Sequence, residues 1–252
     1  MTMDQQLQSI VDRIKANRKP AVEPEYECAE CKDTEYIIYT KEGHEYAKPC
    51  KCKEFKAARR RLIKSGISED DLNKGFNDFL TLNEKGLENA KQKSINYYSD
   101  FEKIRNSRIN SILLSGASGR GKTTLGLALA NNLMRKKNTS VLYMAYREEV
   151  TALKQLIIDE SQYNARMEKL KNASVLFIDD LLKGRVTESD LNIVYEIINH
   201  RYLAKLPMII STEKTLDELM EFDEAIGGRI VEMSKGYIVT FDSSIPNYRL
   251  RH

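Results

Sequence analysis

The second half of the chain alternates between short apolar runs and longer amphipathic stretches. Five runs lack regular polar alternation: SILLS (111–115), SVLYM (140–144), SVLFI (174–178), PMIIS (207–211) and YIVTF (237–241). Such runs are typical of strands that are buried on both faces of a parallel sheet, and the stretches between them suit crossover helices. The pattern therefore predicts an α/β domain with a five-stranded parallel sheet.

One of the crossover stretches carries its own helix-start signal. Thr187-Glu-Ser-Asp190 has the spacing of a capping box, in which the first and last side chains each bond the other residue's backbone. The apolar residues that follow at helical spacing predict the buried stripe of this helix: Leu191, Val194, Tyr195 and Ile198.

Ahead of the α/β pattern the chain falls into three further regions. Residues 1–20 carry one apolar helical stripe and are expected to form an amphipathic helix that ends at Pro20. Residues 21–65 contain all four cysteines and close with the basic run KEFKAARRRLIK (53–64), which indicates a helix. Residues 66–100 are polar and helical in pattern, and we expect them to link this module to the domain at 101–252.

A complete phosphate-binding signature, G-x-x-x-x-G-K-T, directly follows the first apolar run. A strand before it and a helix after it supply the context that the signature requires. The glycines let backbone N–H groups face phosphate oxygens, and the helix start adds partial positive charge. We expect Lys122 to reach the β- and γ-phosphates of ATP and Thr123 to bind Mg²⁺. The whole predicted nucleotide loop is Gly116, Ala117, Ser118, Gly119, Arg120, Gly121, Lys122, Thr123 and Thr124.

The third apolar run ends in an acidic pair, Asp179 and Asp180, at the sheet edge where the phosphate loop also lies. Asp179 is expected to hold Mg²⁺ through a coordinated water. Asp180 takes the position of the usual water-activating Glu, with a side chain one methylene shorter. We therefore hypothesise slow intrinsic hydrolysis that a partner accelerates. The alternative is an acidic strand end without chemistry.

Further polar residues are candidates for sensing the nucleotide. Three compete for contact with the γ-phosphate after the fourth run, with Thr212 favoured: Ser211, Thr212 and Glu213. Arg229, beside a glycine pair, is a candidate arginine finger toward a neighbouring subunit's nucleotide. Arg249 and Arg251 in the terminal NYRLR are candidates for a second sensor. Simple loop polarity is the alternative for the three residues after the fourth run, and a solvated surface residue is the alternative for Arg229.

The four cysteines form two short pairs, C-x-x-C and C-x-C: Cys28 with Cys31, and Cys50 with Cys52. Short pairs suit tetrahedral Zn²⁺, because each turn directs two thiolates at one point. The segment between them predicts a β-hairpin that turns at Glu42-Gly43 and brings the pairs together. A segment with so small a hydrophobic core needs a further source of stability, which a structural metal ion would supply. His44 stays open as a replacement ligand, and a redox pair is the alternative to a metal.

Composition narrows the class of protein. A chain of 252 residues, 41% hydrophobic and 31% charged, is long enough for a real core. Forty basic and 37 acidic residues leave a net charge of +3, which permits nucleic-acid binding without arguing for it. No signal peptide or apolar run of membrane-spanning length is evident, so we expect a cytoplasmic protein without membrane contact. Cysteines in that reducing compartment suit metal ligands.

Several segments together resemble the bacterial and phage DnaC/DnaI-type helicase loaders, which are AAA+ ATPases of the initiator clade. The resemblance runs from about residue 75 to 252 and rests on the phosphate loop, FIDDLLKGRVTESDLNIVYEIINHRY, PMIIST, GGRIVEM and NYRLR. The cysteine module is similar to the zinc-binding N-terminal domain of the DnaI branch. The resemblance implies a P-loop AAA+ fold that binds ATP with Mg²⁺ and single-stranded DNA and assembles with copies of itself. It also implies that the N-terminal module docks on the hexameric replicative helicase.

Position by position, the resemblance assigns Walker A to the phosphate loop, Walker B to Asp179 and Asp180, and the finger to Arg229. Acidic pairs of this type are usual in such loaders. This chain departs from a Thr-Ser-Asn-like sensor by placing an anionic Glu213 near phosphate. Only about forty residues follow the sensor strand, too few for a full helical lid. Closure over the nucleotide then depends on neighbouring subunits or the tail.

The leading interpretation is an ATP-dependent loader that delivers a replicative helicase onto single-stranded DNA during replication initiation. Cations in KQLIIDESQYNARMEKLKN (154–172), with Lys183 and Arg185, are candidates for contact with the DNA backbone. One alternative is an IstB-like transposition-targeting ATPase, and another is a phage-type adaptor that holds or blocks the helicase with ATP as a switch. A small-molecule P-loop kinase is a third, but no acceptor-binding segment is evident for it.

Overall fold

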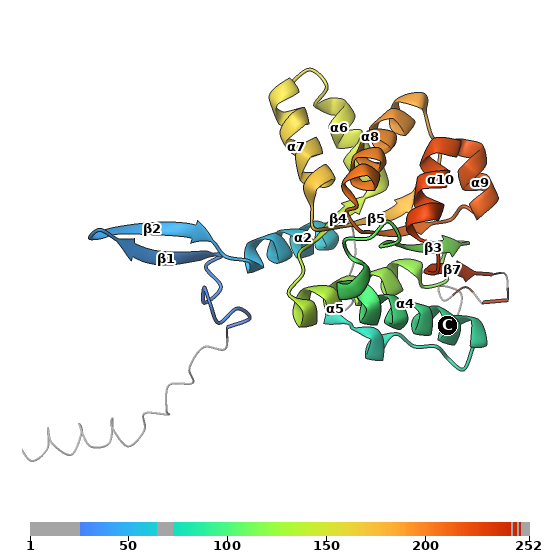
Figure 1. The fold of residues 1–252 in the computed structure, drawn as a ribbon, viewed down its shortest axis with the longest axis horizontal. Coiled ribbons are helices and arrows are strands. Elements are labelled where there is room, and N and C mark those ends of the chain that lie inside the picture. The colour runs from blue at the N-terminus through green and yellow to red at the C-terminus, as the bar shows by residue number, and fades with distance from the viewer. Residues whose placement is uncertain (1–25, 65–72, 243, 246, 248–252) are drawn as a thin grey trace, which may run out of the picture. The chain divides into compact units, whose positions relative to one another are not determined.

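The structure is a computed structural model that describes residues 26–64, 73–242, 244–245 and 247 (Figure 1). The chain divides between Cys52 and Lys53 into two compact units, which are described separately. The amphipathic helix expected over residues 1–20 lies outside the described residues. None of the helices in the described part of the chain combines the length and apolar character that a membrane crossing requires.

The first unit is built on the predicted hairpin. Strand β1 (Tyr36–Lys41) pairs antiparallel with β2 (His44–Pro49), and the turn falls at Glu42-Gly43 as expected. Both turn residues have positive φ, +53° and +80°, which is the backbone that a two-residue hairpin turn requires. The hairpin side chains are mostly exposed, and among the described residues the buried hydrophobic side chains of this unit are Cys31 and Cys50. The cysteines therefore form its small core.

The second unit contains the predicted parallel sheet, and each of the five apolar runs forms one strand. The strand order is β4-β5-β6-β3-β7, and all four neighbouring pairs are parallel. The strands are β3 (Ile112–Gly116), β4 (Val141–Ala145), β5 (Val175–Leu181), β6 (Met208–Thr212) and β7 (Ile238–Phe241). Because β3 lies between β6 and β7, the loop that leaves it emerges beside the carboxyl ends of these two parallel strands.

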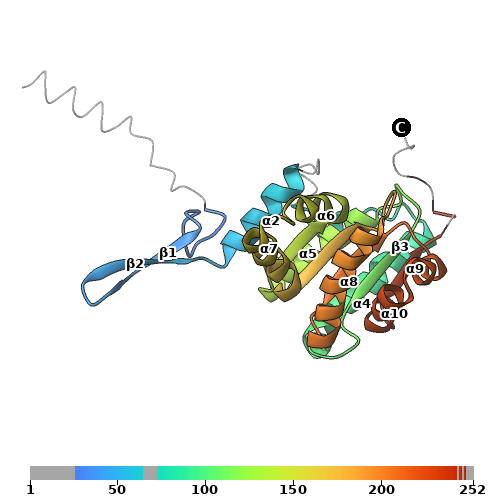
Figure 2. The ribbon, with the colours of Figure 1, turned by 90° about the horizontal axis from the view of Figure 1, so that it is seen from above.

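Helices cover both faces of this sheet, and each face has its own apolar core (Figures 1 and 2). On one face lie the 3-10 turn η1 (Phe76–Asp78), α4 (Lys85–Ile104) and α5 (Lys122–Lys137). On the other lie α6 (Tyr146–Gln155), α7 (Glu160–Asn172), α8 (Glu188–Ala204), α9 (Leu216–Phe222) and α10 (Glu224–Met233). The basic run after the cysteines also forms its predicted helix, α2 (Cys52–Lys64).

Helix α8 begins with the predicted capping box between Thr187 and Asp190. Its buried stripe differs from the prediction, because Tyr195 is 37% exposed and Leu191 is only half-buried. The buried residues are Asp190, Ile193, Val194, Ile197, Ile198 and Arg201. Apolar residues lie on more than one side of this helix, so periodicity alone did not determine which side faces the sheet. In the structure the side with Ile193, Val194, Ile197 and Ile198 is the one that packs inward.

Arg201 is a fully buried cation that joins several elements of this face. Its guanidinium donates to the carbonyl oxygens of Leu170, Lys171 and Ala173, at 3.0, 3.0 and 2.9 Å, and to that of Pro207 at 2.7 Å. These carbonyls lie at the end of α7 and just before the starts of β5 and β6. Burial lowers the pKa of Arg201 to about 9, so it stays protonated at neutral pH. One side chain thus bonds backbone groups of the last turn of α7 and of the two connections that lead into β5 and β6.

Candidate functional site

The phosphate loop connects the end of β3 to the start of α5. Gly116 and Gly121 have φ of +140° and +91°, and a Cβ on Gly116 would collide with the carbonyl of Phe241. The glycines of the signature are thus needed for the path of the backbone. The buried ammonium of Lys122 turns back over the loop and donates to the carbonyl oxygen of Ala117 at 2.8 Å. Burial lowers the pKa of Lys122, while the charges of Asp180 and Glu213 act in the opposite direction.

Asp179 lies at the end of β5 with its carboxylate directed at the phosphate loop. The hydroxyl of Thr123 donates to its Oδ1 at 3.0 Å, and the hydroxyl of Tyr143 donates to its Oδ2 at 2.9 Å. The hydroxyl of Ser211 also donates to Oδ1. Burial raises the pKa of Asp179; the bond from Ser211 lowers it, and the charge of Asp180 raises it. The two residues expected to share Mg²⁺, Thr123 and Asp179, are therefore already in contact.

Tyr143 and Ser211 are functional-site residues with different sequence signals. Tyr143 was missed, although it is the hydroxyl-bearing ring in an otherwise apolar run, SVLYM, next to the acidic strand. Ser211 was a candidate for the γ-phosphate sensor, but its hydroxyl instead bonds Asp179 and accepts from the N–H of Asp180 at 2.9 Å. Both side chains therefore hold the Asp179 carboxylate, and Ser211 also bonds the backbone of Asp180.

Asp180 has different partners from Asp179, and the pairing of β5 with β6 is irregular around both residues. The β5–β6 register shifts between Ile178 and Leu181, and Asp180 adopts a left-handed backbone with φ of +56°. Its carboxylate forms an ion pair with Lys183 at 2.8 Å. Lys183 also lies 3.1 Å from the carboxylate of Glu213, which follows β6.

A cavity of about 310 Å³ opens over the phosphate loop. Its lining comprises Ser118, Gly119, Gly121, Lys122, Thr123 and Thr124 of the loop and helix start, with Asp180 and Lys183. A second wall comes from residues before α4, which the sequence did not single out: Lys74, Asp78, Phe79 and Leu80. The cavity thus joins a polar end, which suits phosphates, to a partly apolar end, which suits a planar base.

The phosphate loop also contacts the end of β7 and the segment after it. Arg120 donates to the carbonyl oxygen of Asp242, which ties the loop to the end of β7. A Cβ on Gly119 would collide with the side chain of Asn247, so the described part of the C-terminal segment also lies against the loop. Arg249 and Arg251 lie outside the described residues.

Two predicted sensing residues are not brought to the cavity. Thr212 is fully buried, and its hydroxyl donates to the carbonyl oxygen of Leu181 at 2.8 Å. Arg229 lies on α10, where it donates to the side chain of Asn199 at 3.0 Å and packs over two tyrosine rings of α8. Within the chain Arg229 therefore faces α8 rather than the phosphate loop, and its finger role stays a prediction about a neighbouring subunit.

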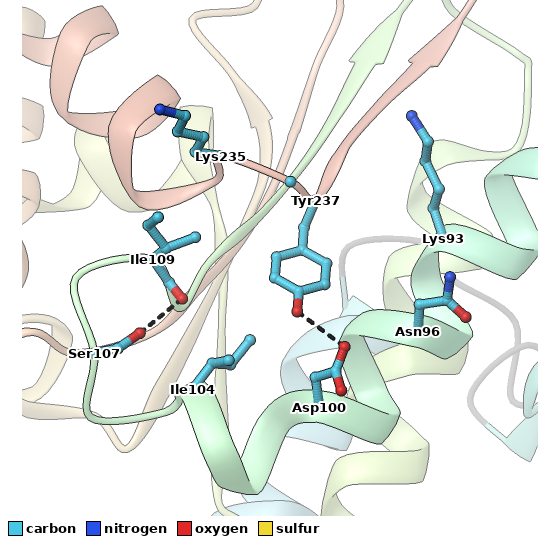
Figure 3. A pocket seen from close by; sticks show the side chains of 9 residues that line it. Lys93, Asn96, Asp100, Ile104, Ser107, Ile109, Lys235 and Tyr237 are labelled. Atoms are coloured by element: carbon cyan, nitrogen blue, oxygen red, sulfur yellow. Dashed lines mark hydrogen bonds between the residues drawn. The ribbon is translucent and has the colours of Figure 1, made fainter.

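A larger cavity, of about 520 Å³, lies at the opposite end of the sheet (Figure 3). Part of its polar lining is paired within the cavity: Tyr237 donates to Asp100 at 3.0 Å, and Ser107 donates to the carbonyl of Ile109 at 2.9 Å. It has no glycine-rich backbone turn and no helix start facing it. The smaller cavity, over the phosphate loop, is therefore the candidate nucleotide site.

The four cysteine sulfurs of the first unit converge, and all lie within 4.8 Å of one another. The Sγ atoms of Cys28 and Cys50 are 3.7 Å apart, and those of Cys31 and Cys52 are 3.3 Å apart. Tetrahedral zinc thiolates, with Zn–S near 2.3 Å, place sulfurs about 3.8 Å apart, so the donor set fits such an ion. His44 begins β2 at the hairpin turn, at the other end of the strand from the cysteines, and is not part of this group.

The candidate DNA-contacting cations of 154–172 are largely engaged in ion pairs. Lys154 pairs with Asp190, Arg166 with Glu149 at 2.5 Å, and Lys171 with Glu196 at 2.6 Å. Between α6 and α7 the side chain of Ile158 is 98% exposed. This surface is thus less positive than its sequence indicates, and DNA contact there stays a prediction.

Tyr143→Phe is expected to shift the pH dependence of ATP hydrolysis. The Tyr143 hydroxyl bond lowers the pKa of Asp179, so its loss raises that pKa further. The carboxylate is then protonated at higher pH, and the acid-side loss of activity moves upward. At neutral pH we expect a fall in rate of about three- to tenfold, the worth of one hydrogen bond. Rate measurements across pH with Tyr98→Phe as control test this; superimposable profiles would contradict it.

Comparison with known proteins agrees with this geometry. The family described as IstB-like ATP binding protein matches residues 59–231. The phage-like element PBSX protein XkdC of Bacillus subtilis (strain 168) is 34% identical over 260 residues, covering 98% of this chain and 96% of that relative. The uncharacterized protein YqaM of the same strain is 37% identical over 213 residues, covering 81% and 67%.

Solved structures share the fold of the second unit. The crystal structure of DnaI aligns with a TM-score of 0.57 at 22% identity, covering 69% of this chain and 94% of that one. That of the DnaC helicase loader aligns with a TM-score of 0.60 at 20% identity, covering 69% and 100%. The sheet order, the phosphate loop and the family match lead to one conclusion: this chain belongs to the IstB-like ATP binding protein family and carries its P-loop AAA+ ATPase domain.

Proposed function

We propose that the protein is an ATP-dependent helicase loader, which binds the hexameric replicative helicase through its cysteine unit and delivers it onto single-stranded DNA during replication initiation. One observation carries the proposal: a single chain joins an AAA+ nucleotide site to a separate unit whose core is a four-cysteine cluster. The fold similarity to DnaI and to the DnaC helicase loader supports it. Such a role belongs in the cytoplasm.

In this proposal the second unit binds ATP with its phosphates on the loop and its base near Phe79 and Leu80. Mg²⁺ would offset charge on the phosphate oxygens, and the oxygens of Thr123 and Asp179, 3.0 Å apart, would hold it. Asp180 would orient the attacking water. Its carboxylate is occupied by Lys183, which supports slow hydrolysis until a partner rearranges the site. Arg229 would reach the nucleotide of a neighbouring copy.

The cysteine unit would serve as the docking surface for the helicase. Zn²⁺ bound by the four thiolates would supply the folding energy that a two-stranded sheet lacks. The hairpin exposes apolar and aromatic side chains that it cannot bury itself: Tyr36, Ile38, Tyr39 and Tyr46. Tyrosine is enriched among residues that dominate protein–protein binding, so these side chains are the proposed contacts.

Co-elution of the full chain with the host's replicative helicase on size exclusion, with and without ATP, tests the proposal. We expect a complex for the wild type and its loss in Cys28→Ser, which removes one thiolate ligand, while ATP binding persists. Ile38→Ser should weaken the complex about tenfold or more, because a central apolar contact typically contributes over 1 kcal/mol. Ile109→Ser, at an exposed isoleucine of the other unit, is the matched control.

The outcomes separate three functions. A complex that forms and increases helicase loading on single-stranded DNA supports a loader. A complex that forms but suppresses unwinding identifies a phage-type adaptor, which the likeness to a protein of a phage-like element favours. If the wild type forms no complex with or without ATP, the weight shifts to a transposition-targeting ATPase, which the IstB-like family match favours.

A further inference from the structure

The nucleotide cavity has an acidic residue close to where the terminal phosphate of ATP would lie. Glu213 follows β6, and its carboxylate hydrogen-bonds Ser118 of the phosphate loop. A γ-phosphate on that loop would approach both this carboxylate and that of Asp180, which lines the cavity. Like charges at such short range repel strongly in a partly buried site. ATP binding therefore requires a cation between them.

Lys183 is placed to be that cation. Its ammonium lies 2.8 Å from Asp180 and 3.1 Å from Glu213, and its side chain lines the same cavity. Burial lowers the pKa of Lys183, but its bonds to these two carboxylates more than offset this and raise it overall. The side chain remains 37% exposed, so an incoming phosphate can reach it. Two further lysines line the cavity, Lys74 on the opposite wall and Lys122, whose ammonium bonds the loop carbonyl of Ala117 and neither of these two carboxylates.

The backbone fixes this position. Asp180 and Leu182 both adopt left-handed conformations, with φ of +56° and +57°. The N–H of Lys183 then donates to the carbonyl of Asp180 at 3.1 Å, which closes a tight turn and directs the lysine back over the acid. Non-glycine residues occupy such conformations only where the surrounding structure imposes them, and they cluster at functional sites.

We propose that Lys183 is the residue of this site that senses the γ-phosphate and so distinguishes ATP from ADP. An ammonium has three donors, so Lys183 can stay bonded to Glu213 while one N–H passes from Asp180 to a γ-phosphate oxygen. The carboxylate of Asp180 is thereby released and can orient water. With ADP no such acceptor is present, and the pair with Asp180 persists. This inference rests on the proposed function, in which the protein uses ATP, and it identifies the residue that detects the γ-phosphate.

The test measures the affinity of the full chain for fluorescent ATP and ADP analogues in the presence of Mg²⁺. Lys183→Met is expected to lose about tenfold or more in ATP affinity, the worth of a charge-assisted bond, and less than about threefold in ADP affinity. Lys183→Arg should retain discrimination. Adding Glu213→Gln to Lys183→Met should restore part of the ATP affinity, because the uncompensated carboxylate is gone. Lys235→Met, at an exposed lysine of the opposite cavity, is the control.

An equal loss of ATP and ADP affinity, or no loss of either, would overturn the inference. An equal loss means that Lys183 only supports the loop, and no loss means that it does not meet the phosphate. If the wild type itself binds no ATP, the proposed nucleotide function fails as well. Helicase co-elution is measured on the same proteins, so failure of the loader proposal is recognised separately.

Discussion

Replacing Lys122 with Ala is expected to lower the affinity for ATP by about a hundredfold or more, since two charge-assisted bonds to phosphate are lost. The side chain is buried at the loop, where it donates to the Ala117 carbonyl. Calorimetric titration with ATP and Mg²⁺ checks the result. Lys136→Ala, at an exposed lysine near the end of the same helix, is the matched control.

The same variant separates binding from folding. ATP should raise the melting temperature of the wild type, because a ligand of the native state stabilises it, and should leave that of Lys122→Ala unchanged. Without nucleotide the two proteins should unfold alike. A variant that melts early without ATP would mean that the lysine supports the loop, and the loss of affinity would then not report phosphate contact.

Arg201→Met is expected to lower the free energy of unfolding by about 3 kcal/mol or more, because it leaves buried carbonyl groups without donors. Met fills similar volume, so the effect isolates the four hydrogen bonds to Leu170, Lys171, Ala173 and Pro207. Arg201→Lys should recover little, since an ammonium cannot reproduce the planar fork. Urea denaturation followed by circular dichroism measures the change.

Arg105→Met provides the control for a cation of the same unit, since Arg105 is 38% exposed and pairs with Glu102 on the surface. Its removal should change stability by less than about 0.5 kcal/mol. Equal losses in the two variants would show that the buried network contributes nothing beyond a general effect of charge removal.

Short contiguous sequence patterns predicted the main structural elements of this protein. The five apolar runs became the five strands, because each run is a complete local pattern that the parallel sheet only has to assemble. The phosphate loop and the hairpin turn are likewise contained in a few neighbouring residues. Their backbone requirement, positive φ at Gly116, Gly121 and Gly43, is met by the glycines themselves and does not depend on distant parts of the chain.

The directions of the side chains at the ends of the strands could not be predicted in the same way. Successive side chains of a strand face opposite sides, so Ser211 and Glu213 share one side and Thr212 takes the other. The sequence contains that alternation, but not which side faces the loop. The position of Lys183 depends in addition on the register shift after Ile178, which arises from pairing with β6. Arg201 and its carbonyl partners meet only in the folded chain.

The β1–β2 hairpin has a consequence for the tendency of the protein to aggregate. Within the described residues neither strand pairs with a third, so each presents an open edge, and Ile38 beside them is 69% exposed. Open edges with apolar side chains are templates for intermolecular strand addition. If the four thiolates bind Zn²⁺ as proposed, chelation would destabilise the same unit. Under the proposed function, a chain without its metal or its partner would therefore be expected to aggregate through this hairpin.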